Sequence, residues 1–290
     1  MKEGKITKAQ KELYYVDCDG KILMAKARGN FRVKKIKPLV GDNVVIDDLE
    51  DRKAYITEIL PRKNEIKRPN ISNIDQILLF ATIKDPILNL YNLDKYLAMC
   101  EYKDIDVVIV LSKIDLCDEN EVKDFENIYE NIGYKIISLD NFDNFPKEKI
   151  LDILKNKTSA VSGASGVGKS TFLNNLIDME VETGSISEKS KRGKNTTRHT
   201  EIFKIGESSF LFDTPGFDSF DIDFIEDETE LKYLFREFRD KKCKFKDCNH
   251  INEPACAVKN ELADGLISKT RYDNYLMLFE EVKKRRENKW

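Results

Sequence analysis

Residues 159–177 read SAVSGASGVGKSTFLNNLI, and this stretch decides the fold of the central part of the chain. It contains the phosphate-binding loop pattern G-x-x-x-x-G-K-[ST], in which glycines let backbone amides turn inward around a phosphate. The pattern is specific only between a strand and a helix, and residues 159–162 are strand-like while residues 169–177 have helical spacing. We therefore expect a phosphate-binding loop at 163–170, strengthened by the positive end of the helix dipole.

The side chains at the end of this loop have separate chemical tasks. Lys169 is expected to bridge the β- and γ-phosphates of a nucleotide, and the Ser170 hydroxyl is expected to hold Mg²⁺. The residues expected to contact the nucleotide are Gly163, Ala164, Ser165, Gly166, Val167, Gly168, Lys169, Ser170 and Thr171.

A second element follows along the chain, where the strand-like run 209–212 leads into Asp213-Thr214-Pro215-Gly216. A carboxylate at the end of such a strand can accept a hydrogen bond from water on Mg²⁺, and the Gly216 amide can meet the γ-phosphate. Asp-Thr-Pro-Gly placed after a phosphate loop is typical of GTPases of the translation-factor type. We therefore expect Asp213 and Gly216 to act in catalysis together with Lys169 and Ser170.

The base of the nucleotide is expected to be read by Ser112-Lys113-Ile114-Asp115, which follows an apolar strand-like run. This order places Asp115 at the carboxyl edge of a sheet, where open α/β sheets bind ligands. A carboxylate there accepts hydrogen bonds from N1–H and the exocyclic amine of guanine, whereas adenine offers an acceptor at N1 and leaves it unpaired. Lys113 is expected to lie along the base. The usual motif begins with Asn, so Ser112 weakens the pattern and the guanine assignment depends mainly on Asp115.

The order of these elements along the chain is unusual. The base-reading element at 112–115 precedes the phosphate loop, whereas in ordinary GTPases it follows that loop. The strands still suffice for one complete sheet, so the sequence predicts a circularly permuted GTPase domain whose new ends open just after the Asp-Thr-Pro-Gly region. An ATP-dependent kinase or ATPase with a degenerate base reader stays open as an alternative.

The rest of the central region predicts a mostly parallel sheet covered by helices, because apolar strand-like runs alternate with helical spacing. The first of these runs is nearly continuous in apolar residues, as expected for a strand buried on both faces. The expected strands are 74–82, 106–111, 134–139, 159–162, 202–205 and 209–212, and the expected helices are 90–100, 119–132, 147–154 and 169–177.

Residues 1–66 have a different pattern, with short strand-like runs separated by turn signals, which favours a small barrel of the OB type. The expected strands are 13–16, 22–27, 44–47 and 54–59. These 66 residues carry 15 Lys and Arg against 11 Asp and Glu, a net charge of 15 − 11 = +4. A nucleic-acid-binding face and an ordinary solvated barrel fit that charge equally well. The charged stretch 61–70 is interpreted as a linker.

Three cysteines and a histidine crowd together in the pattern Cys243-x₄-Cys248-x-His250-x₅-Cys256. Three thiolates and one imidazole suit a closed tetrahedral Zn²⁺ site, which is structural because no coordination position stays open. The residues immediately around them are loop-like, while the C-terminal region as a whole is expected to be helical, which completes the predicted organisation. It comprises an OB barrel over 1–66, the permuted GTPase domain over 67–221 and a helical zinc-binding domain over 222–290.

The composition excludes several other classes of protein. The 290 residues contain 49 Lys and Arg against 52 Asp and Glu, a net charge of −3, which argues against a wholly basic nucleic-acid coat protein. Six cysteines are too few for a disulfide scaffold. No run approaches the roughly 18 consecutive apolar residues that span a bilayer. We expect a cytoplasmic monomer with reduced thiols and no membrane contact.

Together these motifs resemble one family over essentially the whole chain: the circularly permuted GTPases that depend on the small ribosomal subunit and act in its late maturation in bacteria. The resemblance implies GTP hydrolysis stimulated by the 30S subunit, binding of GTP and GDP with Mg²⁺, contact with 16S rRNA and a cytoplasmic location. It also implies that Thr197, with Thr196 as the alternative, holds Mg²⁺ from a basic loop. The chain departs from the family at Asn195, where a His is common, so the role of that His is not carried over.

Two further features bear on turnover and partners. Phe217 stands where Ras-like enzymes have the Gln that orients the attacking water, so slow unassisted hydrolysis is expected. Basic residues cluster in 189–198 and in 283–286, and in combination with a barrel and a zinc module they favour RNA contact. An RNA-binding scaffold that holds GTP without hydrolysing it stays open as a second alternative.

Overall fold

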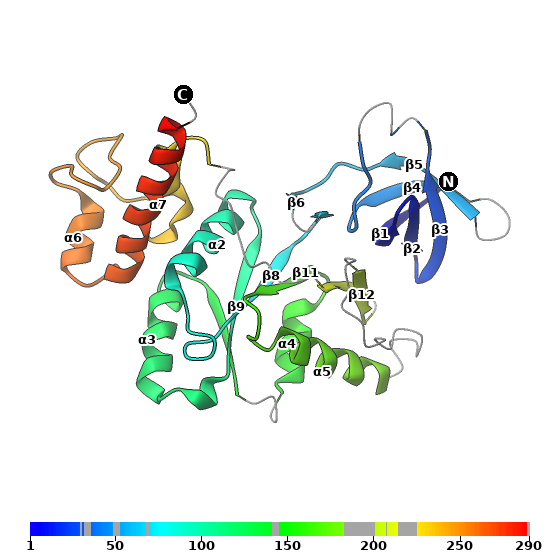
Figure 1. The fold of residues 1–290 in the computed structure, drawn as a ribbon, viewed down its shortest axis with the longest axis horizontal. Helices are drawn as coiled ribbons and strands as arrows, with labels where there is room; N and C mark the ends of the chain where they lie inside the picture. The colour runs from blue at the N-terminus through cyan, green and yellow to red at the C-terminus, as the bar shows by residue number, and fades with distance from the viewer. Residues whose placement is uncertain are drawn as a thin grey trace. The chain divides into compact units, whose positions relative to one another are not determined.

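The computed structural model describes residues 1–29, 31, 36–48, 53–67, 70–140, 145–182, 201–206, 208–213 and 225–288. Figure 1 shows the elements in chain order from blue to red. The chain divides into two compact units, of which the first contains Met1–Phe80 and Asp140–Phe217 and the second contains Ala81–Leu139 and Asp218–Trp290. Each unit therefore joins segments that are distant in sequence.

The first unit begins with a barrel of five strands among its described residues: β1 (Lys2–Gln10), β2 (Leu13–Cys18), β3 (Lys21–Ala27), β4 (Asn43–Asp48) and β5 (Lys53–Ile59). β1 pairs with both β2 and β4, and β5 lies between β3 and β4, so the ring closes. This is the five-stranded order of an OB fold, and the predicted barrel is confirmed. The sequence does not predict β1, because few of its nine residues are apolar.

The barrel core follows from the alternation of side chains along each strand. Ile6, Val16, Leu23, Val44 and Ile56 come from the five strands in turn and are buried in one apolar cluster. On β3 the alternation is clear, because Leu23 and Ala25 are buried while Ile22, Met24 and Lys26 are exposed. The buried positions therefore specify the register of the barrel.

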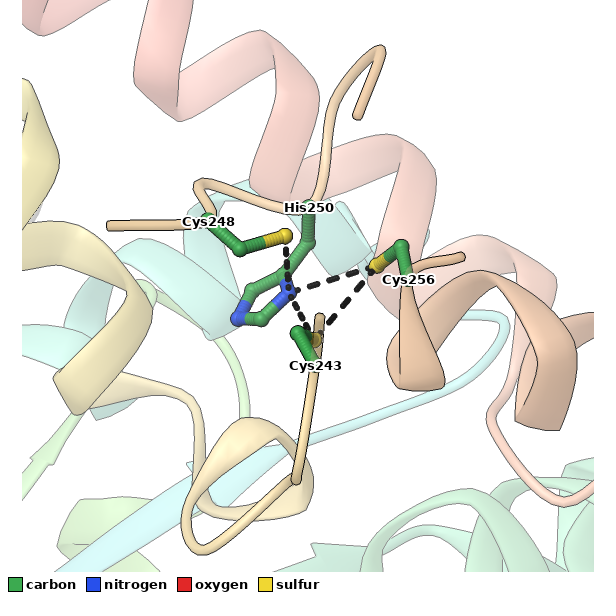
Figure 2. A group of neighbouring side chains, drawn as sticks. All are labelled: Cys243, Cys248, His250 and Cys256. Carbon is green, nitrogen blue, oxygen red and sulfur yellow. Dashed lines mark hydrogen bonds between the residues drawn. The ribbon is translucent and has the colours of Figure 1, made fainter. Parts of the chain in front are cut away.

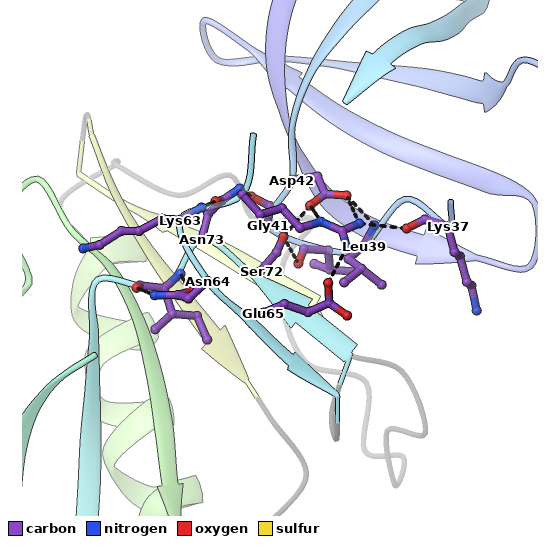
Figure 3. Close-up of polar contacts among 12 residues, drawn as sticks. Lys37, Leu39, Gly41, Asp42, Lys63, Asn64, Glu65, Ser72 and Asn73 are labelled. Atoms are coloured by element: carbon purple, nitrogen blue, oxygen red, sulfur yellow. Dashed lines mark hydrogen bonds and ion pairs between the residues drawn. The ribbon is translucent and has the colours of Figure 1, made fainter. Parts of the chain in front are cut away.

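Residues 61–70 are not the simple linker that their charge predicts. β6 (Glu65–Lys67) and β7 (Asn70–Ser72) pair as an antiparallel hairpin. The reason is tertiary, because the preceding Arg62 and the hairpin itself hydrogen bond to the barrel turn at 39–42, as Figure 3 shows. Local charge gives no indication of these partners.

The barrel turn and the hairpin meet at the buried carboxylate of Asp42. This carboxylate accepts hydrogen bonds from Arg62 Nε at 2.7 Å, Ser72 Oγ at 2.6 Å and the Leu39 amide at 2.7 Å. Gly41 lies beside it with a φ of +99°, and a Cβ at this position would lie 2.1 Å from the Ser72 carbonyl oxygen. We call this group of residues the barrel junction.

The first unit continues into a sheet in which β8 (Gln76–Ala81), β11 (Thr158–Gly163) and β13 (Ser209–Asp213) run parallel, with β12 (Glu201–Ile205) antiparallel to β13. All side chains of β8 and β11 are buried, as expected for strands covered on both faces. The helices of this region are α4 (Lys147–Leu154) and α5 (Lys169–Glu182).

The second unit contains another parallel pair, β9 (Asp106–Ser112) and β10 (Lys135–Leu139), with the helices α2 (Leu90–Tyr102) and α3 (Glu119–Glu130). α3 begins with a capping box, in which Asp118 accepts from the Glu121 amide and the Glu121 side chain accepts from the Asp118 amide. The predicted arrangement of parallel strands and helices is confirmed in both units.

The C-terminal part of the second unit is helical, as predicted. It contains the 3₁₀ turns η4 (Glu228–Leu234) and η5 (Arg236–Phe238) and the helices α6 (Ala257–Ala263) and α7 (Lys269–Glu287), coloured yellow to red in Figure 1. Its apolar core includes Phe235, Phe238, Tyr275 and Leu278, and Ala98 of α2 packs into the same cluster. Among the described residues, no helix combines the length and apolar character needed to cross a membrane.

A buried ionic cluster fastens α7 to α2 within this unit. The Arg271 guanidinium pairs with Asp94 at 2.6 Å and with Glu237 at 2.8 Å. Asn274 Nδ2 and the Tyr129 hydroxyl also donate to the Asp94 carboxylate, at 2.6 and 2.9 Å. Burial raises the pKa of Asp94 despite these donors. We call this group of residues the C-terminal junction.

Candidate nucleotide-binding and metal sites

The phosphate loop has the local context that its sequence requires. β11 ends at Gly163 and α5 begins at Lys169, so the loop connects the carboxyl end of a buried strand to the N-terminus of a helix. Gly163 has a φ of +139°, and a Cβ there would lie 2.4 Å from the Phe80 carbonyl oxygen. Only glycine fits this position, because any side chain would collide with backbone.

The Lys169 ammonium folds back over the loop. Its Nζ donates to the Gly163 carbonyl at 2.6 Å and also to the Ala164 carbonyl. The loop is exposed at Ala164, Ser165 and Gly166, and Ser170 is exposed on the first turn of α5. A bound phosphate can therefore replace the two carbonyls as partner of Lys169 and accept from amides at the same place.

The direction of α5 is fixed by aromatic packing behind the loop. The Phe172 ring lies edge-on to Phe80, with ring centroids 5.0 Å apart, and is tilted against Phe145 at 5.5 Å. The Phe172 amide donates to the Gly168 carbonyl at 3.0 Å, the first hydrogen bond of the helix ladder. The end of the loop is therefore held against β8.

Other predicted catalytic residues lie near the limit of the described chain. β13 ends at Asp213 and runs parallel to β11, with Phe212 opposite Ala160, so the carboxyl ends of both strands lie at one edge of the sheet. This edge carries the phosphate loop. Thr197 and Gly216, together with Thr196, Asn195 and Phe217, lie outside the described residues.

The predicted base-reading element forms the end of β9 and the turn after it. Ser112 is the last residue of β9, and its Oγ donates to the Ala81 carbonyl at 3.3 Å. Lys113 has a φ of +56°, uncommon for a residue with a side chain, and its Nζ pairs with Asp85 at 3.1 Å. The 3₁₀ turn η2 (Ile114–Leu116) presents Asp115 exposed to solvent. The sequence gives no signal for the role of Asp85.

The three cysteines and the histidine converge in the C-terminal part, as Figure 2 shows. His250 Nδ1 lies 3.6 Å from the sulfur of Cys243, 3.5 Å from that of Cys248 and 3.4 Å from that of Cys256. The sulfurs of Cys243 and Cys256 are 4.0 Å apart. All four ligand atoms lie within 4.8 Å of one another, so the four residues form one group that could hold a metal ion.

These separations fit a tetrahedral ion. Zn–S bonds of about 2.3 Å and Zn–N bonds of about 2.0 Å place tetrahedral ligand atoms roughly 3.5 to 3.8 Å apart. The observed sulfur–nitrogen distances of 3.4 to 3.6 Å match this geometry, and the sulfur–sulfur distance of 4.0 Å is close to it. His250 directs Nδ1 rather than Nε2 at the sulfurs, so Nδ1 is the atom that could ligate an ion.

The loop that carries His250 is braced by groups that the sequence analysis misses. The Glu253 carboxylate accepts from the Asn249 amide at 2.7 Å and from the Ile251 amide at 2.8 Å, one on each side of His250. Burial raises the pKa of Glu253, but these and neighbouring backbone donors outweigh it and lower the pKa overall. From α7, Tyr272 donates to the His250 carbonyl at 2.7 Å.

Burial also sets the protonation of the ligands. It raises the pKa of the Cys248 thiol to about 12 and lowers the pKa of His250. The imidazole is therefore neutral and offers a lone pair, whereas the Cys248 thiol would have to release its proton to solvent before its sulfur could bind a cation. The group therefore has the chemistry of residues that could hold a metal ion.

The barrel carries a pocket of about 500 Å³ at the end formed by the β1–β2 turn and the segment after β3. Its lining combines cations with two aromatic side chains and a single carboxylate. The lining residues are Lys11, Glu12, Tyr14, Lys26, Ala27, Arg28, Phe31, Ile36, Lys37 and Pro38. The net positive charge of this region is evident from the sequence, whereas the pocket depends on the folded barrel.

The fold, the phosphate loop and the earlier position of the base-reading element together define a circularly permuted P-loop GTPase. Two crystal structures are similar to this chain over nearly its whole length. One is titled YloQ, a circularly permuted GTPase, with a TM-score of 0.83, 36% identity and coverage of 98% of this chain and 96% of its own. The other is YjeQ from Thermotoga maritima, with a TM-score of 0.85, 34% identity and coverage of 97% and 98%.

The family follows from sequence comparison. The model of the RsgA GTPase matches residues 59–223, and the model of the RsgA N-terminal domain matches residues 3–56. A small ribosomal subunit biogenesis GTPase RsgA from Clostridium perfringens strain ATCC 13124 is 43% identical, covering 99% of this chain and 100% of its own. Another from Alkaliphilus metalliredigens is 40% identical, covering 99% of each chain.

The chain belongs to the RsgA GTPase family. The predicted resemblance, the predicted fold class and the assignment to GTP-hydrolysing enzymes are confirmed by this membership. The permutation explains why the predicted base-reading element precedes the phosphate loop along the chain.

Proposed function

We propose that this chain hydrolyses GTP with Mg²⁺ in late maturation of the 30S ribosomal subunit and that the subunit stimulates the reaction. The observation that carries the proposal is the phosphate loop between β11 and α5 in a chain of the RsgA GTPase family. The relatives that resemble it over their full length are named small ribosomal subunit biogenesis GTPases.

In this proposal the nucleotide phosphates bind at Gly163, Ala164, Ser165, Gly166, Val167, Gly168, Lys169, Ser170 and Thr171. Lys169 exchanges its two carbonyl partners for β- and γ-phosphate oxygens, which places its charge where negative charge develops during transfer. Ser170 and Thr197 hold Mg²⁺, Asp213 accepts from water on the ion, and the Gly216 amide donates to the γ-phosphate. The role of Asp213 agrees with the position of its backbone at the edge of the sheet that carries the loop.

Ser112, Lys113, Ile114 and Asp115 bind the guanine base. The exposed Asp115 carboxylate supplies two acceptors for the N1–H and the 2-amino group. An ATPase is disfavoured, because adenine has no proton at N1 to give to this carboxylate.

Slow turnover of the isolated chain is part of the proposal. Phe217 has no group that can hydrogen bond to water, so the chain lacks at that position the side chain that Ras-like enzymes use to orient the nucleophile. We expect the 30S subunit to supply the group that orients the attacking water, so that GTP hydrolysis depends on the 30S subunit.

The Cys243, Cys248, His250 and Cys256 group binds one structural Zn²⁺. Its support is the tetrahedral separation of the four ligand atoms, with three thiolates as preferred zinc ligands. We expect Cys243→Ser to lower the zinc content of the purified chain from about one ion to none and to unfold the region around α6. Zinc content and a folded C-terminal part that both survive this change would contradict the assignment.

The macromolecular partner in this proposal is 16S rRNA, and the surface that contacts it is on the barrel. Support comes from the barrel pocket, in which Lys11, Lys26, Arg28 and Lys37 can meet phosphates beside the rings of Tyr14 and Phe31.

The domain organisation that we propose is a barrel over 1–66, a GTPase domain over 67–221 and a zinc-binding domain over 222–290. We propose that the chain acts as a cytoplasmic monomer.

The decisive test measures GTP hydrolysis by the full chain with purified 30S subunits, with 50S subunits and alone. We expect turnover well below about 1 s⁻¹ alone, at the bottom of the usual enzyme range, and a large increase with 30S subunits only. Lys169→Ala is the matched control and should stay inactive in all three conditions. Fast hydrolysis by the isolated chain, or equal stimulation by 50S subunits, would contradict the proposal.

A separate binding measurement tests the guanine assignment. Asp115→Asn is expected to weaken GDP and to favour xanthosine diphosphate, whose 2-oxo group accepts the hydrogen bond that the new amide donates. Equal affinity of the unchanged chain for ADP and GDP would instead support an ATP-dependent enzyme.

A further inference from the structure

We propose that the base-reading element at residues 112–115 recognises guanine without a side-chain contact to N7 of the base, and that Ser112 is the residue responsible. The inference rests on the guanine-nucleotide binding proposed above and defines which guanine analogues the same site accepts. It is carried by the contacts of Ser112 and Lys113 within the second unit and by the carboxylate chemistry of the exposed Asp115.

Ser112 occupies the position at which the usual motif has Asn. An amide carries two N–H donors and can give one to N7 of a purine, which is an acceptor. A serine hydroxyl has one proton, and the Ser112 hydroxyl donates it to the Ala81 carbonyl at 3.3 Å. Ser112 is 1% exposed, so this hydrogen bond is made inside the protein.

The other two polar side chains of the element do not replace the missing donor. Asp115 is a carboxylate and only accepts hydrogen bonds when ionised, so it can read N1–H and the 2-amino group but not N7. The Lys113 ammonium pairs with Asp85 Oδ2 at 3.1 Å. Side-chain recognition by residues 112–115 is therefore confined to the donor edge of guanine.

The consequence is that the site should accept guanine analogues that are altered at N7. 7-Deazaguanine replaces N7 by a C–H group and keeps the N1–H and 2-amino donors. A chain that does not contact N7 binds the 7-deaza nucleotide as well as GDP, whereas hypoxanthine, which lacks the 2-amino group, is bound less well. Position 112 then sets tolerance at N7 while Asp115 sets the preference for guanine.

The test is displacement of a fluorescent GDP analogue from the full chain by GDP, 7-deaza-GDP and IDP. We expect the dissociation constants of GDP and 7-deaza-GDP to agree within about twofold and IDP to bind at least about fivefold more weakly, the size of one lost hydrogen bond. Binding of 7-deaza-GDP that is fivefold or more weaker than GDP would overturn the inference.

Two variants assign the effect to position 112. Ser112→Asn is expected to create a preference for GDP over 7-deaza-GDP of about two- to tenfold, because the amide can then donate to N7. A folded Ser112→Asn chain with equal affinities would show that position 112 does not face N7 and would overturn the assignment. Circular dichroism and the melting temperature report folding.

Ser112→Ala needs no extra space and serves when the larger side chain disturbs β9. It is expected to change the affinities for GDP and 7-deaza-GDP by the same factor. A selective loss for GDP would show that the Ser112 hydroxyl reaches N7, against the inference. Failure of the proposed function is distinguishable, because it appears as absent GDP binding or an Asp115→Asn variant without a gain for xanthosine diphosphate.

Discussion

The barrel junction and the C-terminal junction both place an aspartate and an arginine in the interior, but they treat the arginine differently. At the barrel junction, Asp42 is fully buried while the Arg62 side chain is 21% exposed and also pairs with Glu65. At the C-terminal junction, Arg271 is 2% exposed, and its partners Asp94 and Glu237 are as deeply buried. The guanidinium of Arg62 is therefore partly exposed to water at the barrel junction, whereas that of Arg271 is buried at the C-terminal junction.

This difference in burial determines how much stability is lost when one member of the ion pair is removed. A partly exposed guanidinium that loses its partner turns to water, and the cost is mainly the hydrogen bonds left unmade. An enclosed pair that loses one member leaves a charge with neither solvent nor counterion. The number of ion pairs is therefore a poor guide to stability, and the burial of each member is a better one.

The largest effect is expected for Arg271→Ala. The change leaves the Asp94 and Glu237 carboxylates buried without their cation, and we expect the second unit to lose about 3 to 5 kcal/mol of unfolding free energy. Urea unfolding followed by circular dichroism measures it. The control is Lys269→Ala on the same helix, which removes an exposed pair with Asp273 and should cost less than about 0.5 kcal/mol. Equal losses in the two variants would break the comparison.

The next effect is expected at Gly41. A Cβ there would lie 2.1 Å from the Ser72 carbonyl oxygen, in a backbone conformation with a φ of +99°. Gly41→Ala must separate the barrel turn from the β6–β7 hairpin, and we expect a loss of about 2 to 4 kcal/mol. Gly20→Ala is the matched control, because Gly20 has a φ of +83° but nothing within 4 Å, so only backbone strain of about 1 kcal/mol applies. A similar melting temperature for both variants would show that the junction is loose.

Asp42→Ala tests the exposed side of the comparison. It removes the acceptor of the Leu39 amide and the Ser72 hydroxyl, while Arg62 keeps Glu65 and water. We expect a loss of about 2 to 3 kcal/mol, less than for Arg271→Ala, measured by urea unfolding. Asp47→Ala, which breaks the exposed pair with Arg28, is the control within the barrel. A loss larger than that of Arg271→Ala would reverse the ranking of the two junctions.

The smallest effect is expected for Glu281→Gln, which weakens a partly exposed contact between α7 and α2. Burial raises the pKa of Glu281, but hydrogen bonds from Lys95 and Tyr91 outweigh it and lower the pKa below its ordinary value of 4.5. A lowered folded-state pKa means that the stabilisation is present above pH 4.5 and is lost as the pH falls through the folded value.

The unfolding free energies of the unchanged chain and of Glu281→Gln should therefore differ by no more than about 1 kcal/mol at pH 7. The difference should shrink towards zero as the pH is lowered below 4.5 in a series of urea titrations. A difference that grows as the pH falls would show that the pKa of Glu281 is raised in the folded chain. A difference as large as that of Arg271→Ala would remove burial as the deciding variable.

Much of the fold was predictable because strand and helix patterns are local. β11, α4 and the start of α5 follow directly from their apolar spacing and from the phosphate-loop pattern. β1 was missed because its side chains are mostly polar and only barrel closure through β2 and β4 makes it a strand. The charge of residues 61–70 predicts a linker, because the hydrogen bonds that hold the described β6–β7 hairpin come from the distant barrel turn.

The candidate sites divide in the same way. The cysteine and histidine spacing predicts a group that could hold a metal ion, and the four candidate ligand atoms do converge. The spacing did not predict that Glu253 holds the amides on both sides of His250, because a carboxylate three residues away has many other uses. The ion pair between Asp85 and Lys113 could likewise not be predicted from local sequence, because the two residues are 28 positions apart.

The sequence by itself determined the phosphate loop, the order of the motifs and hence the permutation, because glycine conformations and ligand types are properties of short segments. Only the tertiary structure decided which charges are enclosed. Asp94 and Arg271 are 177 positions apart, and nothing near either residue indicates the other. Burial is a property of the packed chain, and it alone makes this ion pair different from the exposed pair at Lys269 on the same helix.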